Sequence, residues 1–127
     1  MKNLLKKAVL ILILIINFSC LNNDDSSSNI NSNFVGNWSG TFNGDDTGTW
    51  DVNVSSNGTV SGTAYSITFS DNYQIQGSVN NNGELTATIG TSDVGGEFIG
   101  QLNGNNANGI WNNSEAEMNG NWIGTKN

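Results

Sequence analysis

The same spacing between a glycine and a tryptophan recurs four times along this 127-residue chain. The four pairs are Gly36 and Trp38, Gly48 and Trp50, Gly109 and Trp111, and Gly120 and Trp122. Residues two apart in a β-strand lie on the same face, so each glycine leaves room beside a large ring and lets the strand bend. The spacing therefore favours a small, strongly curved antiparallel sheet.

From residue 34 onward, short runs of alternating apolar and polar residues are separated by turn residues. Asn57-Gly58 and Asn82-Gly83 are hairpin signals, and one strand is expected to continue through Ile67 and Phe69 to a bend at residues 70–72. No stretch of this region has helical periodicity. About eight strands at about ten-residue spacing predict an all-β domain, an antiparallel up-and-down barrel, with a β-sandwich as the alternative.

The first and last of these strands have nearly the same sequence, GNWSGT at residues 36–41 and GNWIGT at residues 120–125. We expect the two strands to pair and close the sheet, because closure removes the unpaired edges. The interior of an eight-stranded barrel is just wide enough to be filled by side chains or to hold one small ligand.

Residues 34–42, which contain Gly36-Asn37-Trp38, resemble the first strand of calycin-like barrels: lipocalins, avidins and the small barrel domains of bacterial surface lipoproteins. In lipocalins, a Gly-x-Trp on the first strand places its ring in one end of the barrel. Together with residues 57–63, the segment also looks like the opening hairpin of avidin-type barrels. The resemblance implies a lipocalin-like barrel with a small-molecule ligand.

The N-terminus has the layout of a secretory signal peptide. Lys2, Lys6 and Lys7 precede an apolar run at residues 8–16, which is too short to span a bilayer as a helix. The ending at residues 17–20 resembles a bacterial lipoprotein lipobox, with a small residue just before Cys20. That resemblance implies acylation of Cys20 with several chains of the palmitate type, which would make the lipid bilayer a partner. The alternative is a plain secretory signal with an incidental cysteine.

These features divide the chain into a signal peptide (1–19), a lipidated cysteine with a flexible linker (20–33) and a barrel domain (34–127). The linker is rich in Asn, Ser and Asp, and it has too little apolar surface to fold alone. Asp24-Asp25 resembles an acidic export signal of surface lipoproteins, and a solvated tether explains it equally well. We expect a lipid-anchored protein of the bacterial cell envelope, at the outer membrane, with surface exposure as one option.

Composition argues against several functions. After the leader, Lys126 is the only basic residue, whereas all eleven acidic residues remain, so the domain should repel nucleic acid. The chain has no histidine, which excludes catalysis by a Ser–His or Cys–His pair. Asp45-Asp46 lacks the pattern of a calcium loop. A carboxylate pair drawn from the residues Asp93, Glu97, Glu115 and Glu117 has no spacing that demands convergence. We predict no enzyme activity, no catalytic residues, no metal and no cofactor.

The aromatic residues are the candidate ligand-binding residues. Trp38 and Trp122 are assigned to the core, because a domain this small needs large rings to fill it. Trp50 and Trp111, which have polar neighbours, are the candidates for ligand contacts, together with Tyr65 and Phe69 beside an irregular strand.

Two functions follow from these assignments. The first is a non-catalytic module that binds a small apolar or sugar-like ligand at the barrel mouth. The second is a structural or protein-interaction lipoprotein of the envelope with a filled barrel.

Overall fold

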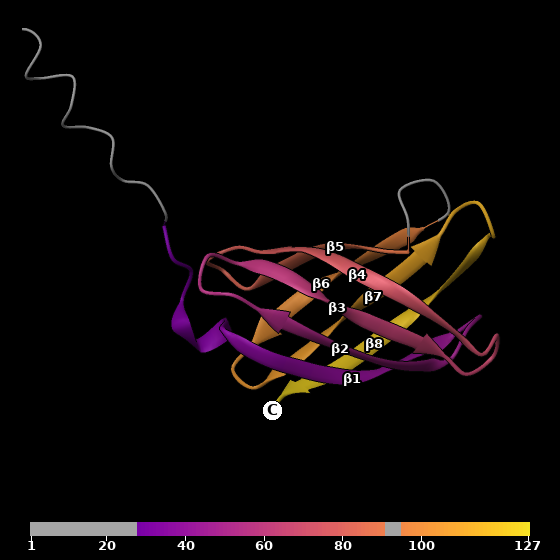
Figure 1. Ribbon diagram of the computed structural model, residues 1–127, viewed down its shortest axis with the longest axis horizontal. Coiled ribbons are helices and arrows are strands. Elements are labelled where there is room, and N and C mark those ends of the chain that lie inside the picture. The colour runs from indigo at the N-terminus through magenta and orange to yellow at the C-terminus, as the bar shows by residue number, and fades with distance from the viewer. Residues whose placement is uncertain (1–27, 91–94) are drawn as a thin grey trace, which may run out of the picture.

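The computed structural model describes residues 28–90 and 95–127. Their elements are a short 3-10 helix, η1 (Ser32–Phe34), followed by eight strands (Figure 1). The strands are β1 (Gly36–Gly44), β2 (Gly48–Val54), β3 (Thr59–Ser66), β4 (Asp71–Val79), β5 (Glu84–Ile89), β6 (Gly96–Asn103), β7 (Asn106–Asn113) and β8 (Met118–Lys126). Within these residues, no helix is long and apolar enough to cross a membrane.

The eight strands form one closed barrel in which each strand pairs antiparallel with its neighbours in the sequence. The barrel closes where β1 pairs with β8, with Gly40 opposite Gly124 and Phe42 opposite Trp122. The predicted up-and-down barrel and the pairing of the first and last strands are therefore confirmed, and the sandwich alternative is wrong. All four tryptophans point into the barrel and are buried.

The strand glycines make room for rings that come from other strands. Trp122 of β8 lies against Gly109 of the neighbouring strand β7, and a methyl group added at Gly109 would fall 2.5 Å from the indole. Trp50 of β2 lies against Gly124 of β8, two strands away around the barrel. These two rings thus cover glycines of other strands, rather than the glycine two positions before them on their own strand.

Each indole N–H donates to a main-chain carbonyl, as buried tryptophans generally require. Trp38 bonds to Phe34 O at 3.0 Å, and Trp50 bonds to Ile123 O at 3.2 Å. The other two bond to Asn43 O at 3.0 Å (Trp111) and to Ile99 O and Ile110 O, both at 3.2 Å (Trp122). These bonds fix the orientation of each ring. For Trp50, Trp111 and Trp122 they need a close approach to the backbone of other strands, which glycines at the contact permit.

One end of the barrel is covered by the segment that precedes β1, and we call it the closed end (Figure 1). Phe34 is buried there, and Ile30 packs against the core. Ile30 N donates to Ser56 O, Asn31 N to the side chain of Asn81, and Lys126 Nζ to Asn33 O. Residues 28–33 fall in the range that the sequence assigns to the linker, and in the structure they pack against the turns of this end.

Two local expectations differ from the structure. Phe34 belongs to η1 rather than to the first strand, which starts at Gly36. The strand expected to reach Phe69 ends at Ser66, because residues 67–70 form a turn in which Ser70 has a φ of 55°. The buried hydroxyl of Ser66 accepts from Phe69 N at 3.0 Å and stabilises this turn. Ile67 and Phe69 therefore alternate like strand residues in the sequence but lie at the barrel rim.

Candidate ligand-binding site at the open end

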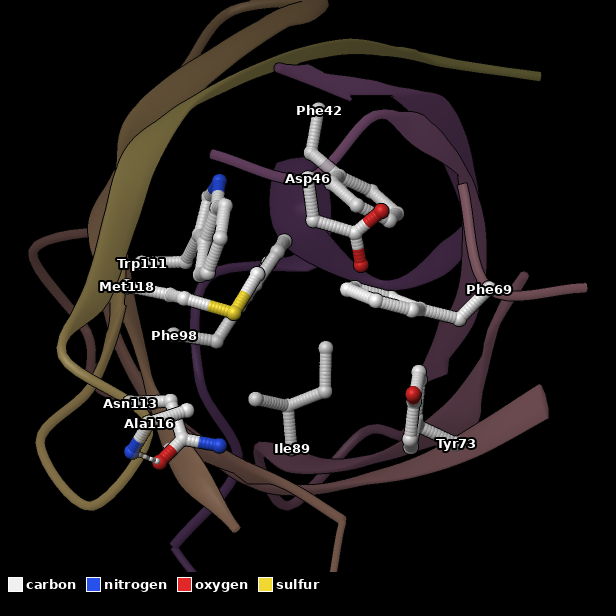
Figure 2. Close-up of a pocket in the computed structure, with 11 residues that line it drawn as sticks. Phe42, Asp46, Phe69, Tyr73, Ile89, Phe98, Trp111, Asn113, Ala116 and Met118 are labelled. Carbon is white, nitrogen blue, oxygen red and sulfur yellow. Dashed lines mark hydrogen bonds between the residues drawn. The ribbon is translucent and has the colours of Figure 1, made fainter. Parts of the chain in front are cut away.

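The opposite end of the barrel, the open end, holds a cavity of about 370 Å³. Binding sites for small molecules usually measure about 300–1,000 Å³, so the cavity is large enough for one small ligand. Figure 2 shows side chains from several strands and turns converging on this hollow. The described lining residues are Phe42, Asp46, Phe69, Tyr73, Ile89, Gly96, Phe98, Trp111, Asn113, Ala116 and Met118.

Five aromatic rings from different parts of the chain surround the cavity. Phe42 of β1 meets Trp111 of β7 edge to face, with ring centroids 5.9 Å apart. Tyr73 of β4 and Phe69 of the β3–β4 turn line the other side, and Phe98 of β6 completes the set. The wall is therefore mainly apolar and rich in ring faces.

Toward the core of the barrel, the cavity is bounded by a packed layer of aromatic rings. Phe98 stacks on Trp122 with centroids 4.5 Å apart and an interplanar angle of 11°. Trp50 meets both rings edge to face, at 5.6 Å and 5.3 Å. Phe98 lines the cavity, whereas Trp122 and Trp50 are not among its lining residues, so these two indoles support the wall from within the core.

One carboxylate, that of Asp46, borders the described part of the cavity. Asp46 is only 7% exposed, and its Oδ1 accepts from Thr47 N and from Ser66 Oγ, both at 2.7 Å. Ser66 is itself buried and also accepts from Phe69 N. Asp46, Ser66 and Phe69 thus form one hydrogen-bonded unit that holds the β1–β2 turn beside the β3–β4 turn. In Figure 2, the carboxylate of Asp46 lies beside the rings of Phe42 and Phe69.

Tyr73 adds a second polar group to the wall. Burial raises the pKa of its phenol, and the negative charges of Asp71 and Asp46 raise it further. The group therefore stays protonated at neutral pH, and its hydroxyl can donate a hydrogen bond to a ligand.

The four residues predicted to contact a ligand occupy different places. Trp111 is 7% exposed and Phe69 is 54% exposed, and both line the cavity. Trp50 is buried beneath it, and its ring contacts the lining residue Phe98. Tyr65 is exposed near the end of β3 and is not among the lining residues.

Cys20, the predicted lipidation site, lies outside the described residues, as do the signal peptide, most of the predicted linker and Asp93. Asp45 and Asp46, the acids considered for metal binding, have different hydrogen-bond partners. Asp45 Oδ2 accepts from Asn119 N at 3.0 Å, whereas Asp46 bonds to Ser66. Within residues 28–90 and 95–127, no group of three metal-ligating side chains is present.

Several lining residues were not singled out from the sequence. Phe42, Tyr73, Ile89 and Phe98 occupy inward strand positions close to the open end, so strand alternation combined with the up-and-down topology contains a signal for them. Ala116 lies in the β7–β8 turn and Met118 is the first residue of β8. At these positions the alternation of apolar and polar residues does not indicate which side chains point inward. Asp46 reads as an ordinary hydrated turn residue, and only the structure reveals its contact with Ser66.

No protein-family model matches this chain, and no curated protein matches it either.

Proposed function

We propose that this protein is a non-catalytic binding module of the bacterial cell envelope, and that the open end of its barrel takes up one small, mainly apolar ligand. The observation that carries the proposal is the aromatic cavity of about 370 Å³ at that end. An apolar hollow with a few polar groups is the usual form of a small-molecule site. The cavity argues against the alternative of a completely filled barrel.

The lining also suggests how a ligand is held. Ring faces from Trp111 and Phe98 offer apolar contact, while Asp46 and Tyr73 offer hydrogen-bonding groups at the same wall. A ligand with an apolar body and one polar end matches this arrangement. A sugar-like ligand stacked on the rings is the second option, because sugar rings also combine an apolar face with hydroxyl groups.

Attachment to the membrane through an acylated Cys20 remains part of the proposal. It is supported by the lipobox-like ending of the leader. Residues 28–34 lie at the closed end, so the open end lies on the opposite side of the barrel from the first described residues (Figure 1). An N-terminal anchor would leave the cavity accessible. Mass spectrometry of the mature N-terminus tests this point, and an unmodified Cys20 would contradict it.

A neutral fluorescent probe, N-phenyl-1-naphthylamine, tests ligand binding. We expect saturable binding of one molecule per chain with increased probe fluorescence. Ala116→Trp should abolish this binding, because residue 116 is exposed in a turn yet lines the cavity, so a large ring there can fill the mouth.

Asn105→Trp is the matched control, because Asn105 is also exposed and lies in the β6–β7 turn at the closed end. This variant should bind the probe like the unaltered protein. Absence of binding to the unaltered protein, or equal binding by both variants, would contradict the proposed site.

A further inference from the structure

We infer that the ligand of this cavity is an organic cation, with an ammonium or quaternary ammonium group on an apolar body. This inference rests on the proposed function and narrows its ligand class. Three observations support it: a largely buried carboxylate with no counter-ion among the described residues, a wall rich in aromatic rings, and an uneven distribution of charge between the barrel ends.

The first observation concerns Asp46. The hydrogen bonds from Thr47 N and Ser66 Oγ both fall on Oδ1, which leaves Oδ2 without a donor from the described part of the chain. Since no buried side-chain polar atom of that part lacks a partner, Oδ2 is reached by solvent and is free to meet a ligand. Among the described residues, no basic side chain lies at the open end, because Lys126, the one lysine or arginine of that part of the chain, bonds to Asn33 O at the closed end. A carboxylate buried to this degree is normally paired with a positive charge. A ligand cation would supply that charge.

The second observation is the wall around this carboxylate. Phe42, Phe69, Tyr73, Phe98 and Trp111 all line the cavity. The face of an aromatic ring carries partial negative charge and attracts cations within about 6 Å, and quaternary ammonium groups are commonly recognised in this way. An anionic ligand would face the same rings and the Asp46 carboxylate, with no positive side chain among the described lining residues, so the cavity disfavours it.

The third observation is the distribution of charge over the barrel. Six acidic residues of the described chain occupy the turns and strand starts of the open end: Asp45, Asp46, Asp71, Glu97, Glu115 and Glu117. At the closed end, Glu84 is accompanied by Lys126. A cleft surrounded by charges of one sign concentrates the oppositely charged ligand near its mouth. The field of the open end therefore favours the same ligand class as the cavity wall.

Three ligands with the same alkyl chain test the inference: octyltrimethylammonium, 1-octanol and octanoate. Their binding to the purified full-length protein is measured by calorimetry at low ionic strength. We expect the ammonium compound to bind about tenfold more tightly than the alcohol, and octanoate to bind more weakly than both.

Asp46→Asn should bring the affinity of the ammonium compound to within about twofold of the alcohol, because the amide keeps an oxygen for Ser66 but loses the charge. Asp51→Asn is the matched control: it removes the same charge from an exposed position on β2 and should preserve the preference. Phe69→Leu, at the exposed rim, should weaken binding of the cation more than binding of the alcohol.

The outcomes separate the two proposals. If the alcohol or octanoate binds at least as tightly as the ammonium compound, the cavity is a binding site but the inferred ligand class is wrong. If the preference survives in Asp46→Asn, the carboxylate has no role and the inference is overturned as stated. If none of the three ligands binds, and the neutral probe does not bind either, the proposed function fails together with the inference.

Discussion

The two ends of this barrel are built from the same alternating strands, yet one is packed and the other is hollow. At the closed end, η1 places Phe34 over the interior, and Phe34 O accepts the indole N–H of Trp38. At the open end, no described segment plays this part, and the inward rings of Phe42, Phe98 and Trp111 border a cavity instead. The comparison indicates that a short segment preceding the first strand determines which end is filled.

The turns at the two ends differ as well. At the closed end, the hairpin turns use glycine at positive φ, as at Gly58 and Gly83. Two turns of the open end instead have a non-glycine residue at positive φ: Ser70 and Glu117 each have a φ of 55°. Such residues cost about 1–3 kcal/mol each and tend to occur at functional sites. The open end also has glycines at positive φ, Gly44 and Gly90, but among the described residues the two strained non-glycine positions both lie there, beside the cavity.

The largest expected effect comes from a change that disrupts the barrel as a whole. Gly109→Ala adds a methyl group that overlaps Ile99 O and lies 2.5 Å from the ring of Trp122, and backbone at such a contact has no room to move. We expect the free energy of unfolding to fall by about 4 kcal/mol or more. Denaturant unfolding followed by tryptophan fluorescence measures this loss.

Gly104→Asn is the control for the preceding change. Gly104 has a φ of 62°, which asparagine adopts more readily than most residues, and an added Cβ there meets no atom within 4 Å. The loss should stay below about 1 kcal/mol. Equal losses at the two glycines would show that close packing of rings against strand glycines is not what holds the barrel together.

A matched pair of phenylalanines tests the contrast between the two ends directly. Phe34→Ala should lower the free energy of unfolding by about 3 kcal/mol, because it removes the buried ring that covers the closed end. Phe69→Ala should cost less than about 1 kcal/mol, because Phe69 is 54% exposed at the open end. Its effect should instead be a weaker affinity for the neutral probe. Comparable losses of stability in both variants would remove the distinction between a structural and a binding end.

The smallest effect is a dependence of stability on alkaline pH. The folded state holds the pKa of Tyr73 above its ordinary value of about 10, through burial first and then through Asp71 and Asp46. Above about pH 10 the unfolded chain therefore releases this proton more readily than the folded protein, so stability falls as pH rises. Below that pH, both states keep the proton and this contribution to stability is complete.

Tyr73→Phe isolates this contribution. The difference in unfolding midpoint between the variant and the unaltered protein should be constant up to about pH 9 and should change in favour of the variant at about pH 11. A constant difference across this range would show that the environment of Tyr73 does not favour the protonated phenol.

Much of the fold follows from the sequence because it depends on local periodicity. The Gly-x-Trp spacing and the similarity of residues 36–41 and 120–125 predict a curved sheet whose first and last strands pair, and the register of Gly40 opposite Gly124 agrees with this. The covering of the closed end was not predicted, because Phe34 continues the alternation of the first strand. The structure shows that Phe34 is the last residue of η1 and that its side chain is buried.

The site follows from the sequence only in part. Trp111 and Phe69 were singled out and line the cavity, whereas Trp50 supports it from below and Tyr65 faces outward. Asp46 acquires its place through contact with Ser66, a residue twenty positions away in the sequence. The sequence spacing between a turn residue and the end of a strand two elements later does not predict a contact. This part of the site could therefore be identified only from the three-dimensional structure of the barrel.

Methyl NMR during titration with an apolar ligand separates the two ends of the barrel, because both carry suitable probes. We expect the methyl signals of Ile89, Ala116 and Met118 at the open end to shift with saturation, while those of Val54, Val60 and Leu102 near the closed end stay in place. Shifts of equal size at both ends, or none at the open end in the presence of excess ligand, would contradict the division of this barrel into a packed half and a binding half.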